Sequence, residues 1–463
     1  MAKILLVEPA FKNKYPPLAL MKISTYHKML GDNVYFCKGK NAELRMDKWD
    51  RIYISTLFTF HWNITVDTIC YYKSSVDKIS DIYCGGVMAT VLSDELEKEH
   101  KVTVIKGLLD KPGVLGEDSY IVDTMSPDYS ILDVSKNKHL DYTYSVCDSY
   151  IAYATRGCVR NCPFCAVPEI EPCFSPYIDI KKQVDYIKDN FGEKKNLLLL
   201  DNNVLASSNF DKIIEDIKLL GYEKGATYKT TKNGKTNSSQ KYVDFNQGID
   251  ARLLTREKCR KLAEIAIRPL RIAFDHADDE TIKLYKEKAE LAAECGIEHL
   301  SNYILFNFDD TPEDLYNRLE INVLLNENFK EAGYKARIWS FPMKYTPIKG
   351  EHSKDRKFIG KEWNRKYLRA IQCILNATHG VVGPKKEFFY VAYGKDIDEF
   401  LKILAMPEDY IINRKFYKTY GLTDEWNEAF SRLDDDSSTL DFIMNGDLRK
   451  IKSRTNCVLK FYV

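Results

Sequence analysis

The sequence predicts an α/β fold in three parts: an N-terminal doubly wound domain, an array of six β/α units that curls into a partial barrel, and a mainly helical C-terminal region. Short apolar runs followed by amphipathic helical segments recur through most of the chain, whereas the last part shows helical periodicity alone. We expect domains at residues 1–140, 141–378 and 379–463. A chain of 463 residues is long enough for about three units of 150 residues.

The first domain begins with an apolar strand at residues 3–7, followed by an amphipathic helix at 17–30 that ends at Gly31. Further strands are expected at 33–36, 51–55 and 82–86. Strands that alternate with helices favour a parallel sheet with helices on both faces, which is the doubly wound arrangement.

Six strand and helix pairs follow. The strands are expected at residues 150–155, 197–200, 243–247, 270–274, 303–306 and 336–340. Helices follow at 180–190 and 209–219, from Thr255, at 279–294, from Thr311 and at 361–375. Right-handed crossovers would curl such a parallel array into a barrel or partial barrel. Ligands bind at the carboxyl ends of such strands, where Asp201, Gln247, Asp275 and Asn307 are expected.

Composition excludes several classes of protein. Lys plus Arg number 68 and Asp plus Glu number 67, so bulk positive charge cannot drive nucleic-acid binding. No apolar run approaches the roughly 20 residues that span a bilayer, and the run before Glu8 is too short for a secretory signal. We therefore expect a cytoplasmic protein without a membrane partner. In a reducing compartment, clustered cysteines are typically metal ligands or catalysts.

Three of the twelve cysteines lie close together, in the run Arg156-Gly-Cys158-Val-Arg-Asn-Cys162-Pro-Phe-Cys165. Soft thiolates at this spacing suit an iron–sulfur cluster or zinc. A structural zinc site needs a fourth ligand, for which Cys173 and Cys147 are the candidates. Three thiolates on a [4Fe–4S] cluster would leave one iron open to a substrate or cosubstrate.

This motif, with Phe164 before the third cysteine, resembles the radical S-adenosylmethionine (SAM) superfamily. The resemblance implies a (β/α)6 partial TIM barrel and a [4Fe–4S] cluster on Cys158, Cys162 and Cys165. It also implies reductive cleavage of SAM to a 5′-deoxyadenosyl radical, fed by an electron donor such as flavodoxin or ferredoxin.

The same resemblance implies SAM contacts. The segment from Phe245 to Thr255 resembles the third-strand segment of the family, where Gln247 and Arg252 would hold the SAM carboxylate or ribose. Asp201 stands where the family has its second-strand motif for the SAM amino group, although the common Gly-Gly-Glu is absent. Asp275 stands where a fourth-strand acid often contacts SAM. Each residue can equally be a turn or helix cap.

The N-terminal domain resembles the Rossmann-like cobalamin-binding domain attached to many radical SAM enzymes. The elements that carry this resemblance are Tyr-Pro-Pro-Leu-Ala-Leu at 15–20, Ser55-Thr56-Leu57 and Gly85-Gly86. Glycines there would let the backbone approach a large cofactor. The Asp-x-His-x-x-Gly motif that gives cobalt a histidine ligand is missing, which also permits an empty domain. Cys37, Cys70 and Cys84 could be proposed for a second cluster, but Cys84 lies on a likely strand and Cys37 ends one, which favours buried hydrophobic residues.

With cobalamin bound, the resemblance favours methyl transfer to an unactivated carbon, which would make the protein a transferase. Without it, a radical rearrangement, cyclisation or modification of a nucleotide or nucleic acid is the alternative. A small-molecule or nucleotide-type substrate is expected in either case.

A rival interpretation is a zinc-stabilised protein that binds nucleic acid through residues 335–369, which hold 11 basic and 3 acidic side chains among interleaved aromatic residues. A charged helix face with core aromatic residues explains the same pattern. Residues 222–242 are expected to form a solvated loop near the active face, where they could touch the substrate.

Overall fold

The computed structural model describes residues 1–232, 235–435, 437–448 and 458–462. Contacts divide the chain into two compact units, which are described separately: residues 1–269 with 346–358, and residues 270–345 with 359–463. The predicted domain boundaries near residues 140 and 378 stay predictions. Among the described residues, no helix is both long enough and apolar enough to cross a bilayer.

The N-terminal part of the first unit is a five-stranded parallel sheet within residues 1–105, a range that the structure describes completely. Its strands are β1 (Lys3–Glu8), β2 (Asn33–Lys38), β3 (Arg51–Thr56), β4 (Ile82–Gly86) and β5 (Thr103–Ile105). Its helices are α1 (Leu18–Met29), α2 (Ala42–Met46), α3 (Trp62–Tyr72), α4 (Val87–Val91) and α5 (Ser93–His100). The predicted strands and first helix of this part are present, each within a few residues of its expected bounds.

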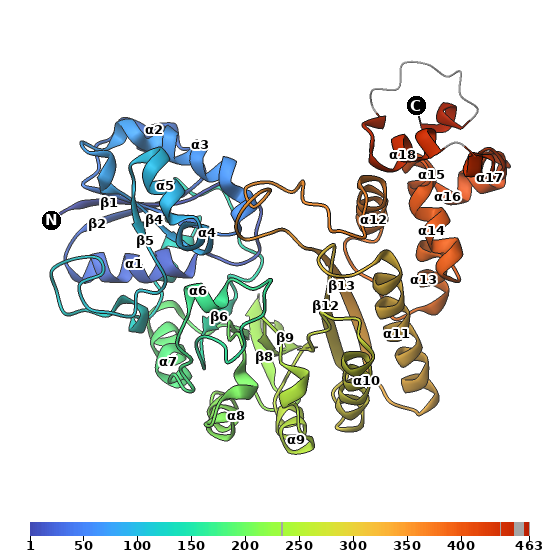
Figure 1. Cartoon of the computed structure of the whole chain (residues 1–463). Helices are drawn as coiled ribbons and strands as arrows, with labels where there is room; N and C mark the ends of the chain where they lie inside the picture. Colours follow the sequence, from blue (N-terminus) through green and yellow to red (C-terminus); the bar gives the residue numbers. More distant parts are fainter. Residues whose placement is uncertain (233–234, 436, 449–457, 463) are drawn as a thin grey trace. The chain divides into compact units, whose positions relative to one another are not determined.

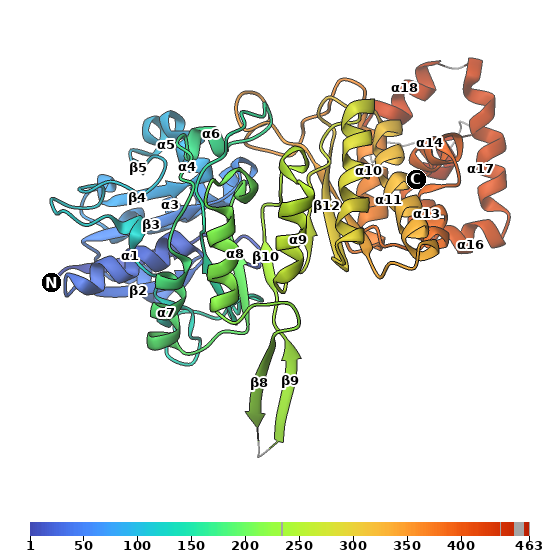
Figure 2. The ribbon, with the colours of Figure 1, turned by 90° about the horizontal axis from the view of Figure 1, so that it is seen from below.

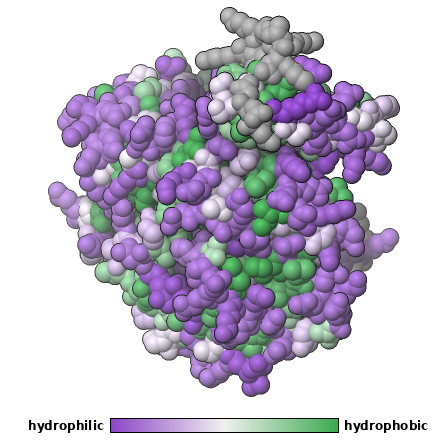
Figure 3. Space-filling view, turned by 45° about the vertical axis from the view of Figure 1, so that its right-hand side comes forward, coloured by the Kyte–Doolittle hydropathy of each residue, from purple (hydrophilic) through white to green (hydrophobic). Residues whose placement is uncertain are grey.

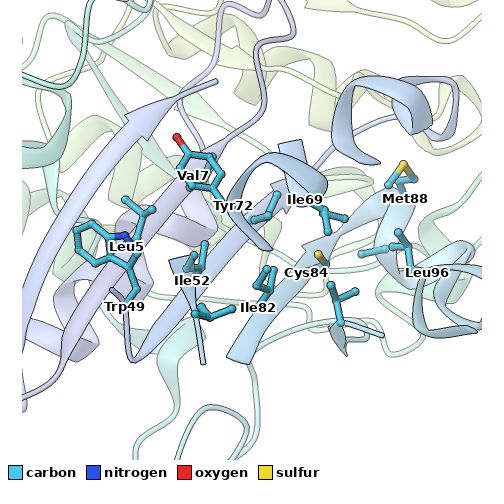
Figure 4. Packing of buried hydrophobic residues seen from close by; sticks show 14 of the residues in the cluster. Leu5, Val7, Trp49, Ile52, Ile69, Tyr72, Ile82, Cys84, Met88 and Leu96 are labelled. Carbon is cyan, nitrogen blue, oxygen red and sulfur yellow. The ribbon is translucent and has the colours of Figure 1, made fainter. Parts of the chain in front are cut away.

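The strand order is β2-β1-β3-β4-β5, so the chain reverses direction across the sheet between β1 and β3. In a doubly wound sheet, that reversal opens a crevice at the carboxyl ends of those two strands. Helix α1 lies on one side of the sheet and α2, α3 and α5 lie on the other (Figure 1). Alternate strand residues such as Leu5, Ile52 and Ile82 pack against Ile69 of α3 and Leu96 of α5 (Figure 4). This burial stabilises the sheet at its core.

The rest of the first unit carries three β/α pairs. Its strands are β6 (Ser149–Ala152), β7 (Asn196–Leu199) and β10 (Val243–Phe245), parallel in the order β10-β7-β6. Its helices are α6 (Val167–Ile170), α7 (Ile180–Phe191), α8 (Phe210–Leu219) and α9 (Arg256–Glu264). The Thr255 side chain accepts a hydrogen bond from Lys258 N and starts α9 as predicted, whereas Asn209 precedes α8 without a side-chain cap.

The loop predicted at residues 222–242 is instead an antiparallel hairpin, β8 (Thr227–Lys232) and β9 (Lys235–Gln240), which extends away from the body (Figure 2). The hairpin lies between α8 and β10, and Tyr228 and Lys241 contact Glu193 just before β7. It therefore leaves the amino ends of the strands, so the expectation of a position near the active face was wrong. The sequence did not predict these strands, because both faces of the hairpin are solvated and therefore carry polar residues instead of an alternating apolar pattern.

The second unit contains three more parallel strands, all within the fully described range 270–435: β11 (Leu270–Arg271), β12 (His299–Phe306) and β13 (Arg337–Lys344), in that order. Helices α10 (Asp279–Glu294) and α11 (Pro312–Glu331) follow β11 and β12. Pro312 at the first turn and a capping box between Thr311 and Asp314 begin α11 as predicted. The predicted strand at 270–274 is shortened to its first two residues.

The remaining elements are helical, as predicted for the C-terminal region. They are α12 (Arg365–Ala377), α13 (Lys386–Tyr393), α14 (Ile397–Ala405), α15 (Glu408–Ile412), α16 (Arg414–Thr419), α17 (Leu422–Ser431) and α18 (Ser437–Asn445). On the face shown in Figure 3, hydrophilic side chains predominate, and several groups of hydrophobic side chains lie among them.

Residues 346–358 form a strap that belongs to the first unit although it lies between β13 and α12 in the chain. The ammonium of Lys354 lies 3.7 Å above the Trp62 ring and 3.3 Å from the Glu99 carboxylate. Lys349 forms an ion pair with Glu169 of α6 at 2.8 Å. Cation–π and ionic contacts at both ends thus fix the strap to the first unit.

Candidate functional site

The cysteine loop occupies residues 153–166, between β6 and α6. Cys158, Cys162 and Cys165 are all partly exposed and form no disulfide. Gly157 has φ +75°, and a Cβ there would lie 2.5 Å from the carbonyl oxygen of Cys173, so only glycine fits. Arg156 pairs with Ser175 in an antiparallel bridge. These two contacts hold the backbone at the start of the loop in one conformation.

Three N–H groups point at the sulfurs of this loop. The backbone amide of Arg160 and the side-chain amide of Asn203 donate to Cys158 Sγ at 3.4 and 3.5 Å. The backbone amide of Val167 donates to Cys165 Sγ at 3.5 Å. Such hydrogen bonds stabilise a thiolate, and in iron–sulfur proteins they tune the reduction potential. The loop thus provides an environment for thiolate ligands.

No three His, Cys, Asp or Glu side chains in the described part of the chain converge on a point that could hold a single metal ion. A [4Fe–4S] cluster makes a different demand, because each cysteine binds its own iron and the sulfurs need not meet at one point. Three thiols spread along one loop, with N–H donors beside two of them, fit that demand.

Asp201 lies at the carboxyl end of β7, as predicted, but its side chain points inward and is 0% exposed. Its carboxylate accepts hydrogen bonds from the backbone N–H groups of Ala154 and Thr155 and from the Thr155 hydroxyl, the last at 2.7 Å. Burial raises the pKa of Asp201 to about 6, against the opposing effect of these donors. Asp201 therefore anchors the entrance to the cysteine loop. A contact between this residue and SAM stays a prediction.

Glu171 anchors the same loop from its other side. Its carboxylate accepts hydrogen bonds from Gly157 N at 2.5 Å and from Asn202 Nδ2 at 2.9 Å, and it lies 3.3 Å from the Arg156 guanidinium. The Arg156 guanidinium also stacks 4.0 Å above the Tyr153 ring. Nothing in the sequence singles out Glu171, because a glutamate six residues after the last cysteine of the motif carries no signal of its own.

Asp250 joins the cysteine loop to the segment after β10. Its carboxylate accepts from Arg160 Nε at 2.9 Å and from Arg252 Nε at 2.7 Å. The Arg252 side chain is exposed and interacts electrostatically with Cys162 and Cys158, so this predicted SAM contact does lie beside the thiols. Gln247 is exposed and Phe164 is half-buried in the same unit. Their contacts with SAM stay predictions.

The predicted cobalamin contacts come together at the carboxyl ends of β3 and β4. Ser55 pairs in register with Gly85, and Leu57 follows directly after β3. The Ser55 hydroxyl is buried and has no hydrogen-bond partner. A Cβ at Gly85 would touch nothing closer than 3.8 Å, whereas one at Gly86 would lie 2.3 Å from the carbonyl oxygen of Thr56. Gly86 is therefore required by the backbone itself, and Gly85 leaves room beside an unsatisfied hydroxyl.

Asp275 lies in the second unit, and its backbone carbonyl accepts from Arg318 Nη1 at 3.2 Å. Arg318 is fully buried and forms a 2.6 Å ion pair with Asp310. The structure does not bring Asp275 together with the other predicted SAM contacts within one compact unit, so its role stays a prediction.

The basic segment 335–369 is divided between the two units. Several of its side chains point into protein: Lys366 is buried with its ammonium on the Met406 carbonyl, and Trp363 is buried with its indole N–H on Asp310. Arg369 pairs with Glu408. These contacts are typical of a helix face with core aromatic residues.

Residues 153–320 match the radical SAM superfamily. No curated protein matches the chain. Among solved structures, the cobalamin-dependent S-adenosylmethionine radical enzyme OxsB with aqua-cobalamin bound has 16% identity and a TM-score of 0.49, over 77% of this chain and 55% of that one. OxsB with both aqua-cobalamin and S-adenosylmethionine bound has 15% identity and a TM-score of 0.49, over 76% and 54%.

HydG, a maturase of the [FeFe]-hydrogenase, has 14% identity and a TM-score of 0.31, over 59% of this chain and 58% of that one. The chain thus spans little more than half the length of these proteins. The family match begins at the cysteine loop and includes the segment that contains Asp250 and Arg252. Residues 153–320 are thus similar to the radical SAM superfamily, a family whose members use a [4Fe–4S] cluster and SAM.

Proposed function

We propose that the protein is a radical SAM enzyme whose [4Fe–4S] cluster is held by Cys158, Cys162 and Cys165. The observation that carries the proposal is the cysteine loop, in which N–H donors point at two of the three sulfurs. Such a cluster, once reduced by an external electron donor, would supply the one electron that splits SAM into methionine and a 5′-deoxyadenosyl radical.

The surrounding residues hold this loop in place. Asp201 fixes its entrance through Ala154 and Thr155, and Glu171 fixes Gly157. The positive charge of Arg252 lies beside Cys158 and Cys162, where it would offset the negative charge of thiolate ligands to a cluster. Together these contacts order the loop before any cofactor is bound, which lowers the entropy cost of binding.

The decisive experiment is anaerobic reconstitution with iron and sulfide. The wild-type protein is expected to turn brown, with an absorbance band at about 400 nm. After reduction, it is expected to convert SAM to 5′-deoxyadenosine and methionine. Replacing Cys158, Cys162 or Cys165 by Ala should abolish both results. Replacing Cys173 by Ala is the matched control, because Cys173 is exposed and lies outside the motif.

The zinc interpretation predicts a different outcome. A colourless protein that retains zinc, and loses it in Cys173→Ala or Cys147→Ala, would show that a fourth protein ligand closes the site. That result would overturn the proposal.

We further propose that cobalamin binds at the carboxyl ends of β3 and β4, and that the reaction is methyl transfer to an unactivated carbon. The buried, unpartnered Ser55 hydroxyl and the room beside Gly85 support a bound group at this edge of the sheet. The strand order also places the end of β3 at the reversal point, where doubly wound domains bind ligands.

Retention of hydroxocobalamin through desalting tests this part. Gly85→Val should fold normally and lose the cobalamin spectrum, because the side chain would fill the space that the glycine leaves. Equal retention by the wild type and Gly85→Val would place the cofactor elsewhere. No retention by either protein would favour the cobalamin-independent alternatives, a radical rearrangement, cyclisation or modification of a nucleotide-type substrate.

A further inference from the structure

A cluster of one acid and two arginines lies against the cysteine loop. We call Arg160, Asp250 and Arg252 the Asp250 cluster. Arg160 is one of the three residues between the first two cysteines of the motif, and Asp250 and Arg252 follow β10. The cluster therefore connects two segments that are 90 residues apart in sequence.

The geometry of the cluster is closely defined. Asp250 Oδ2 accepts from Arg160 Nε at 2.9 Å and from Arg252 Nη2 at 3.1 Å. Asp250 Oδ1 accepts from Arg252 Nε at 2.7 Å and from Arg252 N at 3.1 Å. Arg252 thus binds the carboxylate through two side-chain nitrogens, an arrangement that fixes the guanidinium plane.

Burial separates the roles of the three side chains. The Asp250 side chain is 7% exposed, whereas those of Arg160 and Arg252 are 37% and 54% exposed. The carboxylate is therefore the inner partner of two outer cations. Its removal would leave both guanidinium groups without their ionic partner next to the thiols.

We propose that Asp250 is a positioning residue for the cysteine loop. Through Arg160 it ties the stretch between Cys158 and Cys162 to the end of β10. Through its ion pair with Arg252, Asp250 holds the positive guanidinium group in place beside the sulfurs of Cys158 and Cys162 and partly neutralises its charge. The inference rests on the proposed function in one respect, namely that this loop carries the [4Fe–4S] cluster.

The electrostatic part of the proposal makes a distinctive prediction, because the acid and the two arginines of the Asp250 cluster carry opposite charges. Replacing Asp250 by Asn removes a negative charge. The loss of this charge stabilises the reduced [4Fe–4S] cluster and makes the midpoint potential of the [4Fe–4S] cluster less negative. Replacing Arg160 or Arg252 by Gln removes a positive charge and shifts the potential in the opposite direction. A purely mechanical role would not produce shifts of opposite sign.

The test uses the reconstituted full-length protein and two measurements, the midpoint potential and the rate at which an iron chelator bleaches the cluster. Asp250→Asn should bleach about tenfold faster than the wild type, because charged hydrogen bonds that hold the loop are weakened. Asp211→Asn is the matched control, since Asp211 pairs with Lys261 between α8 and α9, away from the loop. The control should match the wild type in both measurements.

A second measurement does not require the [4Fe–4S] cluster. In the protein without iron, Asp250→Ala should increase the rate at which Cys162 is alkylated by iodoacetamide, as followed by mass spectrometry. This readout separates failure of the proposed function, in which wild-type protein takes up no iron, from failure of the Asp250 cluster. Potentials that shift in the same direction for Asp250→Asn and Arg252→Gln, or alkylation rates unchanged in Asp250→Ala, would overturn the inference.

Discussion

Replacing Gly86 by Ala should destabilise the protein strongly, for a reason that involves no cofactor. Gly86 ends β4 with φ +104° and ψ −170°, a conformation that is essentially restricted to glycine. A Cβ there would lie 2.3 Å from the carbonyl oxygen of Thr56, its register partner in β3. That carbonyl belongs to the backbone of a central strand and cannot move aside like a flexible side chain.

Two contributions add to the expected cost. A residue other than glycine in this backbone region costs about 1–3 kcal/mol, and overpacking a rigid site costs about 1–3 kcal/mol more. We therefore expect Gly86→Ala to lower the free energy of unfolding by about 2–6 kcal/mol. Urea denaturation of the protein without cofactors, followed by circular dichroism, would measure this loss.

Gly85→Ala is the matched control, one residue away on the same strand. A Cβ at Gly85 would meet only Ile105, at the ordinary contact distance of 3.8 Å. The control should therefore change the free energy of unfolding by less than about 1 kcal/mol. Equal losses for the two variants would refute the reasoning, because the proposed difference lies entirely in φ and in the contact with Thr56.

Two further predictions concern buried charges. Because the pKa of Asp201 is raised to about 6, its folded form binds a proton more readily than the unfolded chain. Wild-type stability should thus fall as the pH rises from about 4 to 6, by up to about 3 kcal/mol. Asp201→Asn should lose this dependence on pH. Urea titrations between about pH 4 and 6 would measure the free energy of unfolding of both proteins. If that free energy changed with pH equally in the variant and the wild type, Asp201 would not be the titrating group. Arg318→Met should cost about 3–5 kcal/mol of unfolding free energy, because it leaves Asp310 buried without its cationic partner. Arg369→Met, which breaks the exposed pair with Glu408, should cost at most about 1 kcal/mol in the same denaturation assay.

The sequence was sufficient to predict the elements whose signal is local. Apolar runs predicted the central strands, and capping residues such as Thr255 and Thr311 predicted helix starts that the structure confirms. The spacing of the three cysteines predicted the radical SAM superfamily, whose model residues 153–320 match.

What the sequence could not supply is the direction in which a polar side chain points. Asp201 follows a strand as predicted, yet its carboxylate turns inward onto the backbone of the cysteine loop. The sequence pattern points to Arg252 and gives no sign of Asp250, although the two side chains bind each other. Such partnerships join segments that are distant in sequence, and neither periodicity nor composition records them.

The strap has a practical consequence for dividing this protein into fragments. Between β1 and α18 the polypeptide passes from one compact unit to the other at residues 269–270, 345–346 and 358–359. No single cut therefore releases either half intact. A fragment that starts at residue 270 would keep the strap but lose Trp62, Glu99 and Glu169, the residues on which it rests, so the two halves are best expressed as one chain.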